Sequence, residues 1–294
     1  MKIGFVGLGI MGRPMSKNIL KAGYEVIIYS RTQSTIDELT AAGAIVACSP
    51  KEVAQESDVI ITMLPNSPEV EEVILGENGI IEGAKAGAVV IDMSSIAPLV
   101  SREISQVLEE RGIEMLDAPV SGGEPKAIDG TLSVMVGGKK EVFDRCYPVM
   151  KTMAASVVLT GSIGAGNITK LANQIIVAIN IAAISEALVL ASKSGVEPEL
   201  VYQAIRGGLA GSTVLDSKAP LIMDRKFDPG FRINLHIKDL SNVLETSHEI
   251  GVPLPLTASV MEMMQSLKVD GLGDEDHGSL VRYYEKMARV EVKR

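Results

Sequence analysis

The segment Gly7-Leu8-Gly9-Ile10-Met11-Gly12 constrains the fold of this sequence more than any other feature. It directly follows an apolar run, Lys2 to Gly7, and it opens a helical pattern that continues to about Ala22. In that context the first glycine permits a tight turn, the second lets a pyrophosphate approach the backbone, and the third allows close helix–strand packing. The helix N-terminus then binds the anion. These six residues predict a dinucleotide site, and the alternative is three ordinary turn glycines.

Apolar runs rich in Val and Ile recur after this segment with helical patterns between them, which favours a parallel sheet with helices on both faces. After Gly161 helical spacing dominates, so we place a boundary near Gly161 to Gly166. The predicted fold class is α/β, with an N-terminal Rossmann doubly wound domain (1–163) followed by an all-α domain (164–294) entered through a long buried helix. The predicted strands are Lys2 to Gly7, Glu25 to Ser30, Asp58 to Leu64, Ala88 to Met93, Ile113 to Asp117, Leu132 to Val136 and Val157 to Thr160.

The segment from Asn167 to Ser194 is apolar nearly all round and predicts a buried helix roughly 40 Å long. Its most apolar part, Ile175 to Ile184, is bounded by Lys170 and Glu186, and we expect it to be too short and too polar to span a bilayer. The apolar surface of the second domain predicts a homodimer or homotetramer. Further helices are predicted at Pro198 to Gly207, Lys238 to Gly251, Pro255 to Val269 and Ser279 to Val290.

Charge and cysteine usage exclude several classes of function. The formal net charge is −9 and no basic stripe is present, so binding to nucleic acid has little electrostatic support. Cys48 and Cys146 have no metal-like spacing with histidine, so we expect no metal site and a reducing compartment. Because the N-terminus lacks the features of a secretory signal, we expect a cytoplasmic location and no membrane partner.

The residues after the second predicted strand bear on the choice of cofactor. An acidic residue there would bind the ribose 2′-hydroxyl of NAD, but this chain has Ser30, Arg31 and Thr32. A cation and hydroxyls can bind the 2′-phosphate of NADP through charge-assisted hydrogen bonds. The sequence therefore favours NADP, with NAD as the second choice, and the alternative interpretation is a solvated arginine in a loop.

Two further loops leave the carboxyl ends of predicted strands, where ligands of open α/β sheets bind. Met63, Leu64 and Pro65 follow one strand, and Ser95 follows another. We expect these four residues to contact the cofactor. The alternative is that both segments are simple turns.

Ser121, Gly122 and Gly123 offer a hydroxyl and successive backbone N–H groups after the strand that ends at Asp117. Such a nest suits the carboxylate of a small substrate. A flexible glycine loop is an equally good interpretation of these residues alone.

Lys170 is unusual because it lies on an otherwise apolar helix, where an ammonium group is costly to bury. Burial and a neighbouring cationic nicotinamide would both lower its pKa toward the range useful for proton transfer. Asn173 and Gln174 follow three and four residues later, on the same side of the helix. We predict that Lys170 is a catalytic proton donor, and the alternative is a lysine that extends to solvent at a helix end.

The last candidate segment contains Phe231 and Lys238, which could cover the cofactor. A solvated pair of Lys238 with its acidic neighbour is almost as good an interpretation. The three histidines, His236, His248 and His277, show no triad or metal pattern and are interpreted as structural.

These motifs occur in one order along the chain, and that order resembles the β-hydroxyacid dehydrogenase family (3-hydroxyisobutyrate dehydrogenase-like) over the whole length. The resemblance rests on the N-terminal glycine segment, Asp117-Ala118-Pro119-Val120-Ser121-Gly122-Gly123, the Lys170 helix and Lys238-Asp239. It implies a Rossmann domain, a helical domain with oligomer contacts, and a catalytic lysine at Lys170.

The resemblance also implies that Ser121, Gly122 and Gly123 hold the substrate carboxylate, that Asn173 assists, and that Lys238 closes over the cofactor. Many relatives have asparagine four residues after the lysine, where this chain has Gln174, so the assisting residue is either Asn173 or Gln174. We also expect Gln174 to bind the substrate. The expected activity is NAD(P)-dependent reduction of a small carboxylate-bearing semialdehyde to a hydroxyacid. A dinucleotide-binding sensor without turnover is the non-enzyme alternative.

Overall fold

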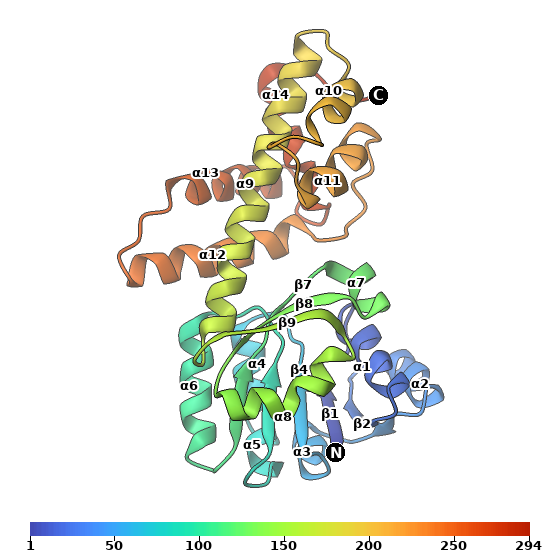
Figure 1. The fold of residues 1–294 in the computed structure, drawn as a ribbon, viewed down its shortest axis with the longest axis vertical. Coiled ribbons are helices and arrows are strands. Elements are labelled where there is room, and N and C mark those ends of the chain that lie inside the picture. The colour runs from blue at the N-terminus through green and yellow to red at the C-terminus, as the bar shows by residue number, and fades with distance from the viewer. The chain divides into compact units, whose positions relative to one another are not determined.

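The computed structural model describes residues 1–294, which form two compact units, Met1–Lys170 and Leu171–Arg294. The first is an α/β unit and the second is entirely helical, so the predicted fold class is confirmed (Figure 1).

The first unit is built on a nine-stranded sheet with the strand order β3-β2-β1-β4-β5-β6-β8-β7. The ninth strand, β9, pairs with β8 in parallel, whereas β8 is antiparallel to β6 and β7. All pairs from β3 to β6 are parallel. The strands are β1 (Lys2–Val6), β2 (Glu25–Tyr29), β3 (Ile45–Val46), β4 (Val59–Thr62), β5 (Val89–Asp92), β6 (Glu114–Asp117), β7 (Val120–Ser121), β8 (Leu132–Gly137) and β9 (Ala154–Gly161).

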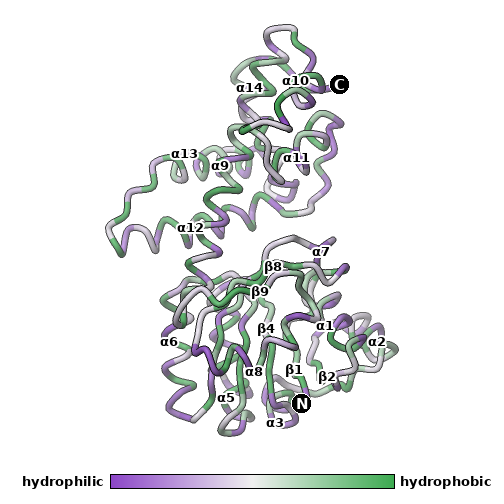
Figure 2. The backbone as a smooth tube through the Cα atoms, in the orientation of Figure 1, coloured by the Kyte–Doolittle hydropathy of each residue, from purple (hydrophilic) through white to green (hydrophobic).

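The sheet is covered on both faces, which is why its central strands are continuously apolar (Figure 2). Ile61 of β4 packs in one hydrophobic cluster with Met15, while its neighbour Ile60 packs in another with Ile74. The helices of this unit are α1 (Gly12–Lys21), α2 (Gln33–Ala41), α3 (Pro50–Gln55), α4 (Ser67–Leu75), α5 (Ile80–Gly83), α6 (Pro98–Glu109), α7 (Gly123–Asp129) and α8 (Lys140–Lys151).

The strand order reverses direction at β1, because the chain adds β2 and β3 on one side and β4, β5 and β6 on the other. Parallel strands with such a switch point form a crevice at their carboxyl ends, where open α/β sheets bind ligands. The loops after β1, β4 and β5 therefore meet at one edge of the sheet.

The second unit has a single hydrophobic core, in which Ile181 and Leu188 pack with Leu240 and Met264. Its long helix, α9, begins within the first unit and continues into the second. The helices are α9 (Ala165–Lys193), α10 (Pro198–Ile205), α11 (Thr213–Met223), α12 (Ile233–Glu249), α13 (Pro255–Val269), a 3-10 turn η1 (His277–Leu280) and α14 (Val281–Ala288).

The expectation that the apolar part of α9 is too short to span a membrane was wrong. The helix has 29 residues and is apolar enough, by length and composition, to cross a bilayer. Of its most apolar window, 44% is buried inside the structure. The helix itself was expected at nearly its full length, but the membrane argument considered only its ten most apolar residues.

Candidate active site

The three glycines after β1 differ sharply in the space around them. A Cβ atom on Gly7, whose φ is 96°, would lie 2.3 Å from the carbonyl oxygen of Met63. A Cβ atom on Gly12 would lie 2.0 Å from the carbonyl oxygen of Gly7, whereas one on Gly9 would meet nothing within 4 Å. Gly7 and Gly12 are thus required by packing, and Gly9 alone faces open space at the start of α1. This arrangement fits the approach of a pyrophosphate to the backbone at Gly9. Leu8 is buried there, Ile10 is exposed and Met11 is half-buried.

The loop after β2 carries hydroxyl and guanidinium groups but no carboxylate. The hydroxyl of Ser30 accepts a hydrogen bond from the backbone N–H of Thr32 at 3.1 Å, which turns the chain toward α2. Arg31 and Thr32 are exposed. Their side chains lie at the end of a central strand, where they could bind a phosphate.

The ends of β4 and β5 are fastened to each other. The hydroxyl of Thr62 donates to Asp92 at 2.8 Å, and the backbone N–H of Leu64 donates to the hydroxyl of Ser94 at 2.9 Å. Met63 and Leu64 are half-buried, as is Ser95, and Pro65 is exposed. The four predicted cofactor contacts therefore lie in loops that follow two neighbouring strands, and Met63 and Leu64 lie against Gly7.

Ser121, Gly122 and Gly123 form the turn between β7 and α7. Gly122 has a φ of 139° and Gly123 a φ of 68°, conformations that residues with a Cβ rarely adopt. A Cβ on Gly122 would also lie 2.7 Å from the side chain of Lys126. The turn thus depends on both glycines, and its half-exposed hydroxyl and backbone are open to a ligand.

Asp117, at the end of β6, binds the start of α9, and this role was not foreseen from the sequence. One carboxylate oxygen accepts the backbone N–H of Gly164 at 2.7 Å, and the other accepts that of Asn167 at 2.7 Å. Burial raises the pKa of Asp117 to about 7, although both hydrogen bonds act to lower it. The first turn of α9 is therefore fixed to the sheet by one buried carboxyl group.

Asn167 extends this attachment with its side chain. Its Oδ1 accepts the backbone N–H of Ile96 at 3.2 Å, and its Nδ2 donates to the hydroxyl of Ser101 at 3.0 Å. Lys170 follows three residues later on the same side of α9 and is buried. Asn167 is itself 1% exposed, and the signal that could have revealed it is a polar residue at the start of an apolar helix.

A chain of polar contacts joins four residues of the second unit. Asn173 donates to the side-chain oxygen of Gln174 at 2.8 Å, and Gln174 donates to the carboxylate of Asp239 at 2.5 Å. Asp239 also forms an ion pair with Lys238 at 2.7 Å. The structure thus brings Asn173, Gln174 and Lys238 together through Asp239, which is buried and was noted in the sequence only as the neighbour of Lys238.

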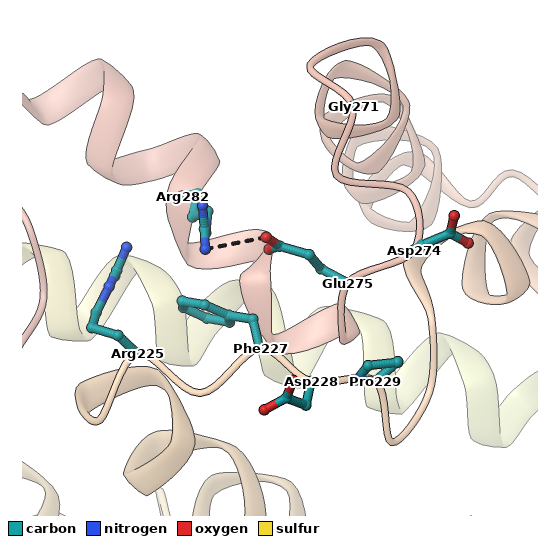
Figure 3. A pocket seen from close by; sticks show the side chains of 8 residues that line it. All are labelled: Arg225, Phe227, Asp228, Pro229, Gly271, Asp274, Glu275 and Arg282. Atoms are coloured by element: carbon teal, nitrogen blue, oxygen red, sulfur yellow. Dashed lines mark ion pairs between the residues drawn. The ribbon is translucent and has the colours of Figure 1, made fainter.

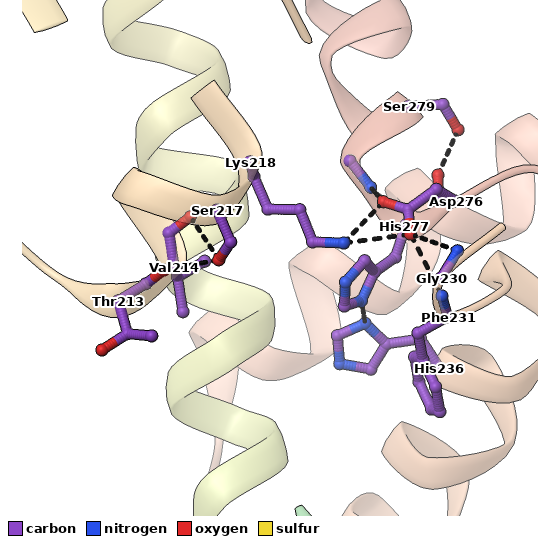
Figure 4. Close-up of polar contacts among 11 residues, drawn as sticks. Thr213, Val214, Ser217, Lys218, Gly230, Phe231, His236, Asp276, His277 and Ser279 are labelled. Carbon is purple, nitrogen blue, oxygen red and sulfur yellow. Dashed lines mark hydrogen bonds and ion pairs between the residues drawn. The ribbon is translucent and has the colours of Figure 1, made fainter. Parts of the chain in front are cut away.

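Phe231 lies beside a buried pair of histidines (Figure 4). The Nδ1 atoms of His236 and His277 are 2.9 Å apart, and the Phe231 ring lies 5.6 and 5.3 Å from the two imidazole rings. Asp276 accepts the backbone N–H of Phe231 at 3.0 Å and pairs with Lys218 at 2.8 Å. The backbone that leads into α12 is therefore fixed by a buried carboxylate.

A cavity of about 390 Å³ lies elsewhere in the second unit and contains none of the predicted site residues (Figure 3). The guanidinium groups of Arg225 and Arg282 lie 4.9 and 4.5 Å from the ring centroid of Phe227. Arg282 also pairs with Glu275 at 3.2 Å, so its charge is balanced within the cavity wall.

Two protein families match this chain, and together they cover most of its length. Residues 2–161 match the family described as the NAD binding domain of 6-phosphogluconate dehydrogenase. Residues 164–284 match the family described as NAD-binding of NADP-dependent 3-hydroxyisobutyrate dehydrogenase. An NAD(P)-binding domain is thus present, as the glycine segment predicted.

Individual relatives cover almost the full length. The chain is 43% identical to 2-hydroxy-3-oxopropionate reductase of Escherichia coli, covering 98% of both chains. It is 38% identical to 2-(hydroxymethyl)glutarate dehydrogenase of Eubacterium barkeri, covering 99% of this chain and 97% of the relative.

Among solved structures, 3-hydroxyisobutyrate dehydrogenase of Mycobacterium tuberculosis with L-serine is similar, with a TM-score of 0.89 and 31% identity. The match covers 96% of this chain and 98% of that one. The resemblance inferred from the ordered motifs is therefore confirmed, and the chain belongs to the NAD(P)-dependent β-hydroxyacid dehydrogenases of the 3-hydroxyisobutyrate dehydrogenase-like family.

Proposed function

We propose that this enzyme reduces tartronate semialdehyde (2-hydroxy-3-oxopropionate) to D-glycerate with NADPH, and that Lys170 donates the proton. The observation that carries the mechanism is a buried lysine one turn past a helix start that Asp117 fixes to the sheet. The choice of substrate is supported by the likeness to the Escherichia coli reductase.

The cofactor would be held by the glycine segment at Gly9 and by the loops after β4 and β5. When bound, NADPH supplies the hydride. Ser30, Arg31 and Thr32 would bind its 2′-phosphate, because they offer donors and a positive charge where NAD enzymes have a carboxylate. Phe231 and Lys238 would cover it.

Lys170 would protonate the oxygen of the aldehyde as negative charge develops there. A buried ammonium group interacts strongly with such a charge, because little water competes for it. The hydroxyl of Ser121 and the backbone N–H groups of Gly122 and Gly123 would hold the substrate carboxylate.

Asn173 would assist the lysine. Gln174 would hold Asn173 in place and border the substrate, because Asp239 fixes its amide. This division of roles between Asn173 and Gln174 follows from the hydrogen bonds of Gln174. Its amide nitrogen donates to Asp239 and its amide oxygen accepts from Asn173.

The nearest competing functions share the same scaffold. A 3-hydroxyisobutyrate dehydrogenase is favoured by the similar Mycobacterium tuberculosis structure, and a succinic semialdehyde (4-hydroxybutyrate) reductase would differ in what lies beyond the carboxylate. A sensor without turnover is disfavoured, because a pure binder has no need of a buried lysine. We further propose a cytoplasmic homodimer or homotetramer, in which exposed apolar residues such as Ile176 and Leu190 of α9 would be covered.

Oxidation of NADPH followed by absorbance tests the proposal directly. The purified protein would be given tartronate semialdehyde, methylmalonate semialdehyde and succinic semialdehyde, each with NADPH and with NADH. The highest kcat/KM with tartronate semialdehyde and NADPH supports the assignment. A higher value with another semialdehyde reassigns the substrate, and no turnover with any of them favours the sensor.

A further inference from the structure

Asp117 and Asn167 connect three parts of the first unit that the reaction would need in register. Asp117 ends β6, four residues before Ser121. Its carboxylate binds the backbone N–H groups of Gly164 and Asn167, at the entry to α9. Asn167 in turn binds the backbone of Ile96, next to Ser95. The substrate loop, the cofactor loop and the lysine helix are therefore all attached to the hydrogen bonds of Asp117 and Asn167, which we call the joint.

The joint is closely packed as well as hydrogen-bonded. A Cβ on Gly166 would lie 2.5 Å from the carbonyl oxygens of Asp117 and Met135. A Cβ on Gly137 would lie 2.3 Å from a carboxylate oxygen of Asp117. Both Asp117 and Asn167 are buried, so neither the side chains nor the first turn of α9 has room to shift.

We propose that Asp117 and Asn167 are positioning residues that set the location of the Lys170 ammonium group relative to the substrate loop. This inference rests on the proposed role of Lys170. A helix is stiff over one turn, so a shift at Asn167 moves Lys170 by a similar distance. Misplacement of a reacting group by about 1 Å can lower a rate by about 100-fold.

Two substitutions test the joint in different ways. In D117N one carboxylate oxygen is replaced by an NH2 group, which cannot accept the N–H bond that the oxygen received. N167A keeps the backbone N–H to Asp117 but loses the side-chain bonds to Ile96 and Ser101. We expect kcat to fall at least tenfold in D117N and severalfold in N167A, while the Kd of NADPH for D117N stays within about twofold of wild type.

The matched control is S57A. Ser57 is buried, and its hydroxyl donates to the backbone oxygen of Val53 at 2.6 Å, far along the chain from the joint. It should lower the melting temperature with kcat unchanged. A merely structural role for Asp117 and Asn167 predicts the same pattern in their variants, and that result would overturn the inference. If D117N does not fold, N167A decides alone by the same criterion.

K170A, measured in parallel, separates this inference from the proposed function. Normal turnover in K170A removes the lysine from the mechanism and the proposed function fails. Loss of turnover in K170A with wild-type kcat in D117N and N167A refutes the positioning role only. A fall in kcat in all three variants, with S57A unaffected, supports both.

Discussion

The carboxylate of Asp117 accepts the backbone N–H of Asn167 at 2.7 Å, and fifty residues of chain separate the two partners. The contact joins the last residue of β6 to the first turn of α9. Burial disfavours the charged form of this carboxyl group, whereas the two N–H groups that it accepts favour it. The free energy of unfolding should therefore depend on whether Asp117 is charged.

The stabilising effect of Asp117 should depend on pH between about 4 and 7. Burial raises its folded pKa from 3.8 to about 7, with Asp92 nearby acting in the same direction. In that interval the folded state binds the proton and the unfolded state does not, so the free energy of unfolding falls as pH rises. The total change is on the order of 4 kcal/mol at most, and it should level off above pH 7.

Denaturant unfolding of wild type and D117N at about pH 4.5, 6 and 8 measures this dependence, since the first two values lie within the interval and the third lies above it. The difference between the two proteins removes the effect of other carboxyl groups, such as the half-buried Glu38, whose pKa is lowered by its hydrogen bond with Lys17. A difference that stays constant from about pH 4.5 to 8 would show that Asp117 does not titrate in this range.

Substitution of Lys170 by alanine or methionine should lower kcat by about 100-fold or more, because a general acid contributes 10²- to 10⁴-fold. The Kd of NADPH should change little, since the glycine segment that would hold the pyrophosphate is untouched. Steady-state kinetics and cofactor fluorescence give the two quantities. Lys193, exposed at the other end of α9, is the control, and K193A should behave as wild type.

The fold was predictable because each signal was local. β1 and the glycine segment are adjacent in the chain, and the apolar runs that became β4 and β5 are buried on both faces. β3 and β7 were missed because each has only two residues, too few to show a period. α12 begins at Ile233 rather than at the predicted Lys238.

The polar joint could not be predicted in the same way. Gly164 lies 47 residues from Asp117, and nothing near either residue indicates the other as its partner. The same is true of Gln174 and Asp239, which are 65 residues apart. Motif reasoning identified Lys170 and the substrate loop as candidates, whereas the groups that orient them depend on tertiary contacts.

Arg31 should determine the preference for NADPH. R31A removes the only cation of the Ser30-Arg31-Thr32 loop, and a charge-assisted hydrogen bond to a phosphate contributes about 1.5 to 3 kcal/mol. We expect kcat/KM for NADPH to fall by about tenfold or more with that for NADH nearly unchanged. K21A, which removes an exposed cation at the end of α1, should leave both values as they are. Equal losses with the two cofactors would place Arg31 outside the 2′-phosphate site.

Gly9 and Gly12 give a matched pair of alanine variants that separates cofactor binding from folding. In G12A the new methyl group would lie 2.0 Å from the carbonyl oxygen of Gly7, so α1 must move away from β1 and the protein should lose stability. In G9A the methyl group meets no protein atom within 4 Å, so the melting temperature should stay close to that of wild type.

The methyl group of G9A would nevertheless occupy the space where the pyrophosphate approaches the backbone. The Kd of NADPH should therefore rise by about tenfold or more in a protein that remains fully folded, as shown by thermal unfolding with and without cofactor. Wild-type affinity in G9A would mean that the dinucleotide does not pass over Gly9. The open space at Gly9 would then have no ligand to explain it. G12A is the contrasting case, in which cofactor binding is weakened by loss of folding and not by a blocked site, since its stability is lost even in the absence of cofactor.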